Sequence, residues 1–523
     1  MGYDNLFHYI EKIRTCDELN EITEDLRIIA ANEKSAIVLK LIEEALHRSE
    51  YLNNIKASIN LKELQIKQLY GFLETIPIIE EILFSMKSAS EELNYPEGII
   101  LSYSIEYGIE KFKGNKDLSQ IAIQKAMDLL EKQVNFDKYV YNVCRYSYAI
   151  ENWLEKHDPK SGAILEECFT YFIDRAIYKG AIHSLGYLSL IYFHFSRRTE
   201  AIEIVKKLLT SKIKIEKLSK DLQTVVYYFL GVVFKLDFRL LEAEKYLIQS
   251  KQVFESNGNG DISSNYYLTT LSHLTTIYAL QGKIDLALEQ MKKVEELLEK
   301  EIFLRNLYSF NKNQIIHTFN LTKFYILSRL HHFNVEKNQD LIQTIISNVG
   351  TYHSNAIMLS EFILNANLAK VMLQDIKNLN NPSTRRIEHI LDFLICRGIE
   401  SDMQTLQRIN TLRRRPVEER MTTVEKALAD LLAAQEYYKI KRFLEIHSLL
   451  KNYQNHLQSI EVLELRVFME AFIQVGEYKN GDPLGPALQY MAIKKCRLYG
   501  FSRLENKLLD YLQLQHKEIT RTT

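Results

Sequence analysis

Two histidine-containing pairs are the residues of this chain that come closest to a metal site. His157 is followed by Asp158, as in the dyads of metal phosphohydrolases, and His331 is followed by His332. Adjacent residues on a helix point about 100° apart, so the two histidines cannot easily ligate one ion. Pro159 follows the first pair, which is typical of a turn between helices. No HExxH motif or cysteine cluster accompanies either pair, so we expect no metal and no cofactor.

The cysteines and glycines also argue against catalysis. An odd number of cysteines without CxxC spacing indicates reduced, buried thiols in a cytosolic protein. The sequence has no GxxxxGK[ST], GxGxxG or GxSxG motif, and no local signature of a Cys-His peptidase. We therefore expect a protein that is not an enzyme. The cysteines are Cys16, Cys144, Cys168, Cys396 and Cys496.

Composition predicts long helices. Only 18 glycines and 7 prolines occur among 523 residues, whereas strand-and-turn folds need frequent turn residues. The net charge of −1 gives no bulk attraction to nucleic acid or to an anionic membrane. The most apolar runs, residues 185–195 and 225–234, are shorter than the roughly 20 residues of a spanning helix. The N-terminus has no secretory h-region, so we expect a cytoplasmic protein.

A spaced pattern of large and small residues recurs along the middle of the chain. Small residues stand at Ser189, Gly231 and Thr275, and each is followed twelve positions later by an alanine. Small side chains at such positions let the two helices of a hairpin approach closely. The best copy resembles a tetratricopeptide repeat, a helix-turn-helix unit that buries its apolar face by stacking. The resemblance is carried by Leu271, Leu274, Thr275, Tyr278, Gly282, Ala287, Met291 and Val294.

The repeats predict the architecture. Their period of about 39 to 44 residues exceeds the 34 of the standard unit. The resemblance implies an all-α, right-handed superhelical solenoid of hairpins with helical caps at both ends. We expect an N-terminal helical region at 1–95, the solenoid at 96–380, and a C-terminal helical region at 381–523. Pro382 marks the second boundary, because the residue before a proline disfavours helix.

The resemblance also implies a concave binding groove lined by the first helix of each hairpin. This wall is mixed polar and apolar, without the Lys/Asn/Arg set that clamps a C-terminal carboxylate in some family members. An extended or helical segment with apolar anchors suits it better. The groove positions carried over from the family are Gly186, Leu190, Phe193, Tyr228, Val232, Lys235, Ser272, Thr276 and Ala279.

An arginine-rich segment is the second candidate site. Residues 384–415 hold seven arginines and four acidic residues. The segment is a solvated pair of helices, a patch that docks a partner, or a helix-turn-helix reader of nucleic acid. Its candidate docking residues are Arg385, Arg386, Arg413, Arg414 and Arg415.

Three functions are consistent with these patterns. The first is a non-catalytic scaffold or adaptor that binds a protein or peptide in the groove, because a solenoid offers a long concave surface. The second is a regulatory sensor that responds to a bound peptide. The third is a nucleic-acid-associated regulator that uses the arginine-rich segment, although the balanced charge makes nucleic acid the less favoured partner.

Overall fold

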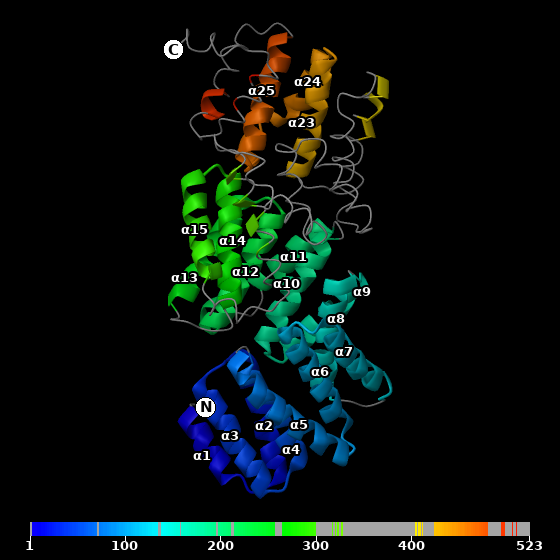
Figure 1. The fold of residues 1–523 in the computed structure, drawn as a ribbon, viewed down its shortest axis with the longest axis vertical. Helices are drawn as coiled ribbons and strands as arrows, with labels where there is room; N and C mark the ends of the chain where they lie inside the picture. The colour runs from blue at the N-terminus through cyan, green and yellow to red at the C-terminus, as the bar shows by residue number, and fades with distance from the viewer. Residues whose placement is uncertain are drawn as a thin grey trace.

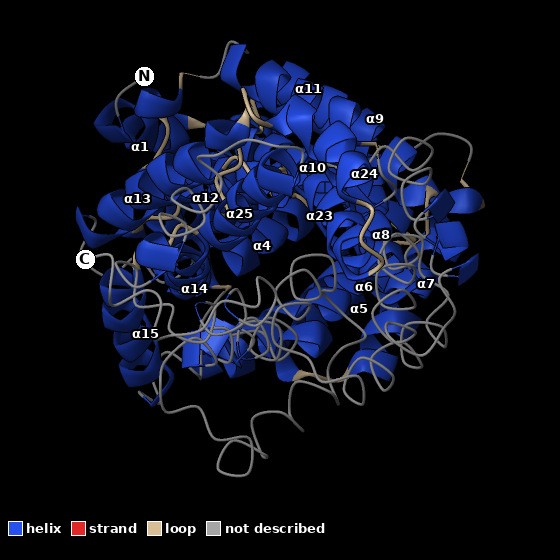
Figure 2. Ribbon diagram, turned by 90° about the horizontal axis from the view of Figure 1, so that it is seen from above, coloured by secondary structure: helices blue, strands red, loops and turns tan. Residues whose placement is uncertain are grey.

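The described part of the chain is all-α. In the computed structural model nearly every described residue lies in a helix or in a short connection, and no strand occurs among these residues (Figure 2). This confirms the predicted all-α class. The structure describes residues 3–70, 73–133, 137–156, 158–194, 197–210, 214–256, 264–299 and 423–479, with single residues or short stretches within 316–327, 403–411 and 493–509.

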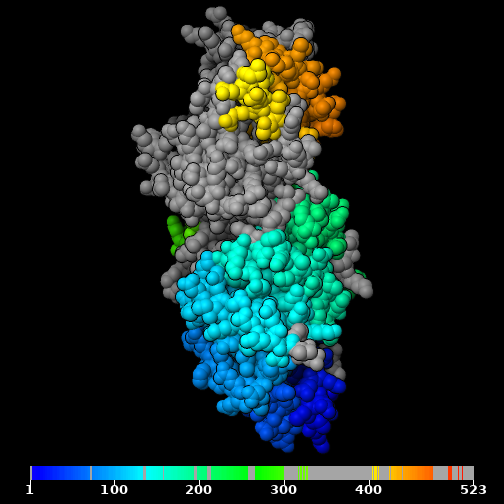
Figure 3. Space-filling view, turned by 90° about the vertical axis from the view of Figure 1, so that its right-hand side faces the viewer, coloured from blue at the N-terminus to red at the C-terminus, as the bar shows by residue number. Residues whose placement is uncertain are grey.

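The first five helices form the N-terminal end of the molecule (Figures 1 and 3). Thr15 begins the second helix with a capping box, in which its hydroxyl accepts from the Glu18 backbone N–H at 3.2 Å. The Glu18 carboxylate accepts in return from the Thr15 N–H at 3.1 Å, so this helix start is fixed by local sequence. The helices are α1 (Tyr3–Lys12), α2 (Cys16–Asn32), α3 (Ala36–Tyr51), α4 (Ile55–Leu69) and α5 (Ile76–Glu92).

Helical hairpins follow, and each packs on the next. The first helix of each hairpin contacts its own second helix, and from α6 to α12 it also contacts the first helix of the following hairpin. Glycines end two of these helices: Gly114 and Gly282 adopt left-handed backbone angles, with φ of 86° and 77°. The hairpins are α6 (Pro96–Lys113) with α7 (Lys116–Glu131), α8 (Lys138–Lys156) with α9 (Lys160–Asp174), α10 (Tyr178–His194) with α11 (Arg198–Thr210), α12 (Lys220–Leu236) with α13 (Leu240–Ser256), and α14 (Ser264–Leu280) with α15 (Ile284–Glu299).

The small residues of the repeats lie at the contacts within the hairpins. Ser189, Gly231 and Thr275 are buried, as are the alanines twelve positions later. A Cβ atom built on Gly231 would come within 2.4 Å of the Leu247 Cγ atom and 3.3 Å of the Ala243 carbonyl oxygen. Helices α12 and α13 therefore approach closely at the predicted position.

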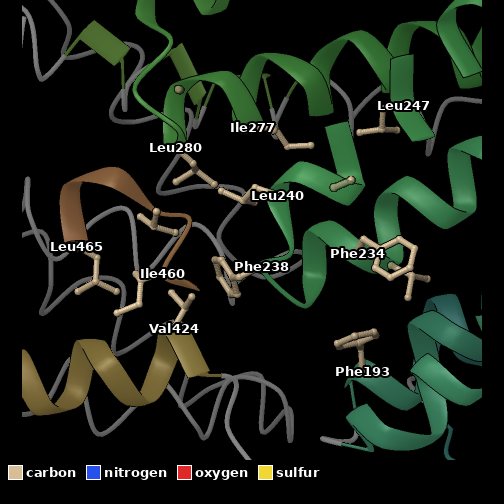
Figure 4. Close-up of a cluster of buried hydrophobic side chains, with 14 of the residues drawn as sticks. Phe193, Phe234, Phe238, Leu240, Leu247, Ile277, Leu280, Val424, Ile460 and Leu465 are labelled. Atoms are coloured by element: carbon tan, nitrogen blue, oxygen red, sulfur yellow. The ribbon is translucent and has the colours of Figure 1, made fainter. Parts of the chain in front are cut away.

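The C-terminal helices α23 (Thr423–Lys439), α24 (Phe443–Leu450) and α25 (Leu463–Lys479) pack near the turns of the last hairpins (Figure 1). Figure 4 shows Phe238 and Leu280 near Val424 and Ile460, all members of one apolar cluster. The Leu463 side chain contacts Gly282 so closely that a Cβ there would lie 2.1 Å from it. The apolar core thus continues from the hairpins into the C-terminal helices.

The predicted boundary at 95/96 has apolar packing across it. One cluster contains Ile59 and Met86 from the N-terminal side together with Ile100 and Leu101 from α6. The predicted boundary at 380/381 lies outside the described residues.

Candidate functional site

Helices α10, α12 and α14 each carry polar or aromatic residues at helical spacing. Lys179 and His183 lie one turn apart on α10, and Tyr228 and Lys235 lie two turns apart on α12. Residues with these separations share one face of a helix. α10, α12 and α14 are the first helices of three successive hairpins and pack side by side (Figure 1). The polar and aromatic residues of neighbouring helices therefore lie next to one another. We call Lys179, His183, Tyr228, Phe229, Lys235, Tyr266 and His273 the inner stripe.

Aromatic contacts join the three helices within the inner stripe. The ring of Tyr228 lies 5.0 Å from that of Tyr266, at 62°, and 6.0 Å from the His273 imidazole, stacked at 21°. His183 lies edge-on to Phe229 at 5.9 Å and to Tyr266 at 6.0 Å. Each contact crosses from one helix to another, so the rings form a continuous set of contacts from α10 to α14.

Lys235 and His273 form the basic pair at one end of the inner stripe. The Lys235 Nζ atom lies 3.0 Å from the His273 Nδ1 atom. An ammonium can only donate, so Nδ1 accepts, and the neutral imidazole carries its proton on Nε2. Burial lowers the pKa of Lys235 to about 8, and burial followed by the charge of Lys235 lowers the pKa of His273 well below its usual value.

Lys235 combines burial with the lack of a carboxylate partner among the described residues. At 6% exposure it is the only buried lysine among the described residues, and no described carboxylate forms an ion pair with it. Lys67 and Lys111, which are more exposed, pair with Glu63 and Glu151. Burying a charge without a counterion is costly, so an anion beside the Lys235 ammonium would stabilise it.

Lys179 and His183 form a second basic pair, on α10. Burial lowers the pKa of Lys179 to about 8, with further contributions from Lys67 and Lys34, while Asp221 opposes the shift. Burial, and then the charge of Lys179, lowers the pKa of His183 to about 3. The His183 Nε2 atom is buried without a hydrogen-bond partner, whereas Nδ1 lies 3.4 Å from the Tyr266 hydroxyl.

The predicted groove residues are mostly covered. Only Leu190 and Tyr228 are half-buried, and the other seven are buried. Tyr228 and Lys235 belong to the inner stripe, and Thr276 bonds to the Thr322 hydroxyl at 2.8 Å. The binding role of the set stays a prediction. The seven buried residues are Gly186, Phe193, Val232, Lys235, Ser272, Thr276 and Ala279.

A contact from the N-terminal helices lies beside Lys179. The Asn32 side chain at the end of α2 donates to the Ala176 carbonyl at 2.6 Å and accepts from the Tyr178 N–H at 2.7 Å. It also accepts, at 3.4 Å, from the Lys179 N–H, so it caps the start of α10. The Ser219 hydroxyl donates to the Asn32 carbonyl at 3.3 Å.

A second polar network, next to α2, is internally paired. Arg27 is 2% exposed and pairs with Glu24 and Asp137, while its guanidinium stacks 4.2 Å above the Tyr139 ring. The Tyr139 hydroxyl donates to Glu63 at 3.1 Å. Carboxylates thus balance this cation, and the network holds α2, α4 and α8 together.

The histidine pairs, the cysteines and the arginine-rich segment of the sequence fall partly inside the described residues. These residues contain no cluster of His, Cys, Asp or Glu that could hold a metal ion, and no helix among them could cross a membrane. Asp158 and Pro159 lie in the turn between α8 and α9, as predicted. The prediction of buried thiols is wrong for Cys16, which is exposed, and holds for Cys144, Cys168 and Cys496, which are buried free thiols. Four predicted features lie outside the described residues: His157, the pair at 331–332, Cys396, and the docking patch of Arg385, Arg386, Arg413, Arg414 and Arg415.

The comparisons with known proteins give no family. No protein-family model matches the chain, and no curated protein sequence matches it significantly.

Proposed function

We propose that this protein is a non-catalytic scaffold that binds a peptide or protein segment against the inner stripe of α10, α12 and α14. In this proposal the hairpins form a right-handed, tetratricopeptide-like superhelix in the cytoplasm. The N-terminal and C-terminal helices cap the superhelix at its two ends. The stacked hairpins support such an arrangement, because an array of first helices offers a continuous surface to an extended ligand.

The observation that carries the proposal is the composition of the inner stripe. Three helices bring five aromatic or imidazole rings into contact beside two lysines, the buried Lys235 and the half-buried Lys179, and neither lysine forms an ion pair among the described residues. A purely structural interface would favour aliphatic packing, or would pair the lysines as Lys67 is paired. Rings with polar edges next to basic groups are suited to hold peptide side chains and backbone.

The test is selection of short random peptides on the purified full chain, followed by fluorescence anisotropy with the enriched peptides. Tyr228→Leu removes the ring that contacts both Tyr266 and His273 but keeps an apolar side chain. We expect this variant to bind the selected peptides about tenfold more weakly, because aromatic anchors dominate such interfaces.

Tyr51→Leu is the matched control, because Tyr51 is 76% exposed on α3, outside the inner stripe. Its affinity should equal that of the wild type. Selection of no peptide, or equal binding by the wild type and Tyr228→Leu, would remove the inner stripe as the binding surface.

A regulatory sensor is the second candidate, and the Asn32 contact favours it. Asn32 binds the backbone N–H of Lys179, and the Lys179 side chain belongs to the inner stripe. A ligand that moves the start of α10 would therefore act on the end of α2. Small-angle X-ray scattering with and without a selected peptide tests this, since a sensor changes its radius of gyration and a passive scaffold does not. The nucleic-acid alternative rests on residues 385–415 and stays a prediction from the sequence.

A further inference from the structure

The Lys235–His273 pair points to the chemistry of the bound segment. Among the described residues, the charge of the Lys235 ammonium is opposed by no carboxylate, and its one hydrogen-bond partner is the neutral His273 ring. Arg27 and Lys111, by contrast, have carboxylate partners: Arg27 faces Glu24 and Asp137, and Lys111 faces Glu151. A site that keeps a buried ammonium without a counterion is complementary to an anion from outside.

The donors at this pair match a single carboxylate. Lys235 uses one of its three N–H groups on His273 Nδ1, and the remaining N–H groups can donate elsewhere. Nδ1 accepts, so the Nε2–H of His273 is a further donor on the same ring. Ammonium and imidazole N–H groups that donate to a carboxylate form charge-assisted hydrogen bonds, which are shorter and stronger than neutral ones.

The surroundings favour a side chain on a peptide over a free ion. The His273 ring is stacked on Tyr228, which in turn contacts Tyr266 and Phe229. Aromatic faces thus lie next to the basic pair, and such faces can cover the methylene groups and backbone of a segment that carries an acid.

We propose that the Lys235–His273 pair binds the carboxylate of an aspartate or glutamate side chain in the bound peptide. This inference rests on the proposed function, because it assumes that a peptide lies along the inner stripe. It adds the class of ligand: an acidic segment, with its acid placed between α12 and α14.

The test is a double-mutant cycle between peptide and protein. Peptides selected on the wild-type chain are synthesised in pairs, with each Asp or Glu replaced in turn by Asn or Gln, and their affinities are measured by calorimetry. On the wild type, one such replacement should weaken binding about tenfold or more, as expected for loss of a hydrogen bond to a charged group. On Lys235→Met, the same replacement should change affinity less than about twofold, since the coupling partner is gone.

Two further variants make the cycle specific. His273→Phe keeps a ring against Tyr228 but removes the Nε2 donor, so it should reduce the preference for the acid. Lys292→Met removes a lysine that is 79% exposed on α15, and it should keep the full preference. Thermal unfolding of each variant shows that the chain remains folded.

The outcomes separate the two proposals. Peptides that bind the wild type with equal affinity in acid and amide forms overturn the acidic-ligand inference and leave the scaffold proposal standing. The same holds if the preference for the acid persists in Lys235→Met, because the acid is then recognised elsewhere. If no peptide binds the wild type, both proposals fail.

Discussion

The side chain of Asn32 caps a helix that begins at Tyr178, 146 residues further along the chain. Its Oδ1 atom accepts from the Tyr178 N–H at 2.7 Å, and its Nδ2 atom donates to the Ala176 carbonyl at 2.6 Å. Helix caps are usually supplied by the residue that precedes the helix. Here Ile177 occupies that position and has no side-chain acceptor, so α2 supplies the cap from a distant part of the sequence.

Asn32→Ala should lower the free energy of unfolding by about 1–3 kcal/mol, because it leaves the Ala176 carbonyl and the Tyr178 N–H without this partner. Urea denaturation followed by circular dichroism measures the change. Asn20→Ala is the control: Asn20 accepts an exposed bond from Asn54 at 3.2 Å, and its loss should cost less than about 0.5 kcal/mol. Equal losses in the two variants would contradict the long-range cap.

Lys235→Met should stabilise the ligand-free protein, and the gain should depend on pH. The native pKa of Lys235 is lowered to about 8 by burial, so below pH 8 the native state bears the cost of a buried charge. Between pH 8 and the ordinary lysine value of about 10.4, the native amine loses its proton while the unfolded one keeps it, and wild-type stability rises relative to the variant. The gain in free energy of unfolding from Lys235→Met is thus largest near pH 7 and falls by a few kcal/mol toward pH 10.

Denaturation of the wild type and Lys235→Met at pH 7, 8, 9 and 10 measures this difference. This pH series lies above the range in which His273 titrates, since the pKa of His273 is well below the ordinary histidine value. A stability difference that stays constant across the series would mean that Lys235 is solvated or paired in the native protein.

Gly231→Ala should destabilise the protein by about 1–3 kcal/mol, because the added methyl group would meet Leu247 at 2.4 Å. A leucine at this position should be worse. Gly162→Ala on α9 is the matched control: its Cβ would lie 3.5 Å from Ile191, an ordinary contact. Alanine also favours helix over glycine, so we expect the control to be neutral or more stable by up to about 1 kcal/mol. Thermal unfolding measures the stability of both variants. If the stability of Gly231→Ala equals that of the wild type, the register of that hairpin is wrong.

Native alkylation should separate the described cysteines. Cys16 is exposed, whereas burial raises the pKa of Cys144, Cys168 and Cys496 to about 12. A buried thiol without thiolate character reacts slowly. Iodoacetamide at pH 8, followed by peptide mass spectrometry, should label Cys16 first and the other three only after denaturation. Native labelling of Cys144 or Cys168 would show that α8 and α9 open readily.

The packing within single hairpins could be predicted from the sequence. Gly231 and Ala243 had to face each other if the repeat spacing was real, and they do. Gly114 and Gly282 end helices because few other residues accept their backbone angles. These features depend on residues close in sequence, for which spacing is a sufficient guide.

Only part of the candidate site could be predicted from the sequence. Tyr228 and Lys235 stood among the predicted groove residues, whereas their partners Tyr266 and His273 did not. The family template placed the inward positions of α14 at Ser272, Thr276 and Ala279, and the side chain that meets Lys235 is one residue beyond Ser272. Which face of a helix receives its neighbour depends on packing between hairpins, and a template from shorter repeats does not fix it.

The cap on α10 also sets an order of assembly. Hairpins that mainly contact their sequence neighbours can form as soon as they are synthesised, because little chain entropy is lost in closing each one. The bond from Asn32 to Tyr178 closes a loop of well over a hundred residues, so it can form only after α10 has emerged. The contact between the N-terminal helices and the start of α10 is therefore made late, after the intervening hairpins have been synthesised. In the folded protein, unfolding that begins at the N-terminal helices must break the Asn32–Tyr178 contact at the start of α10.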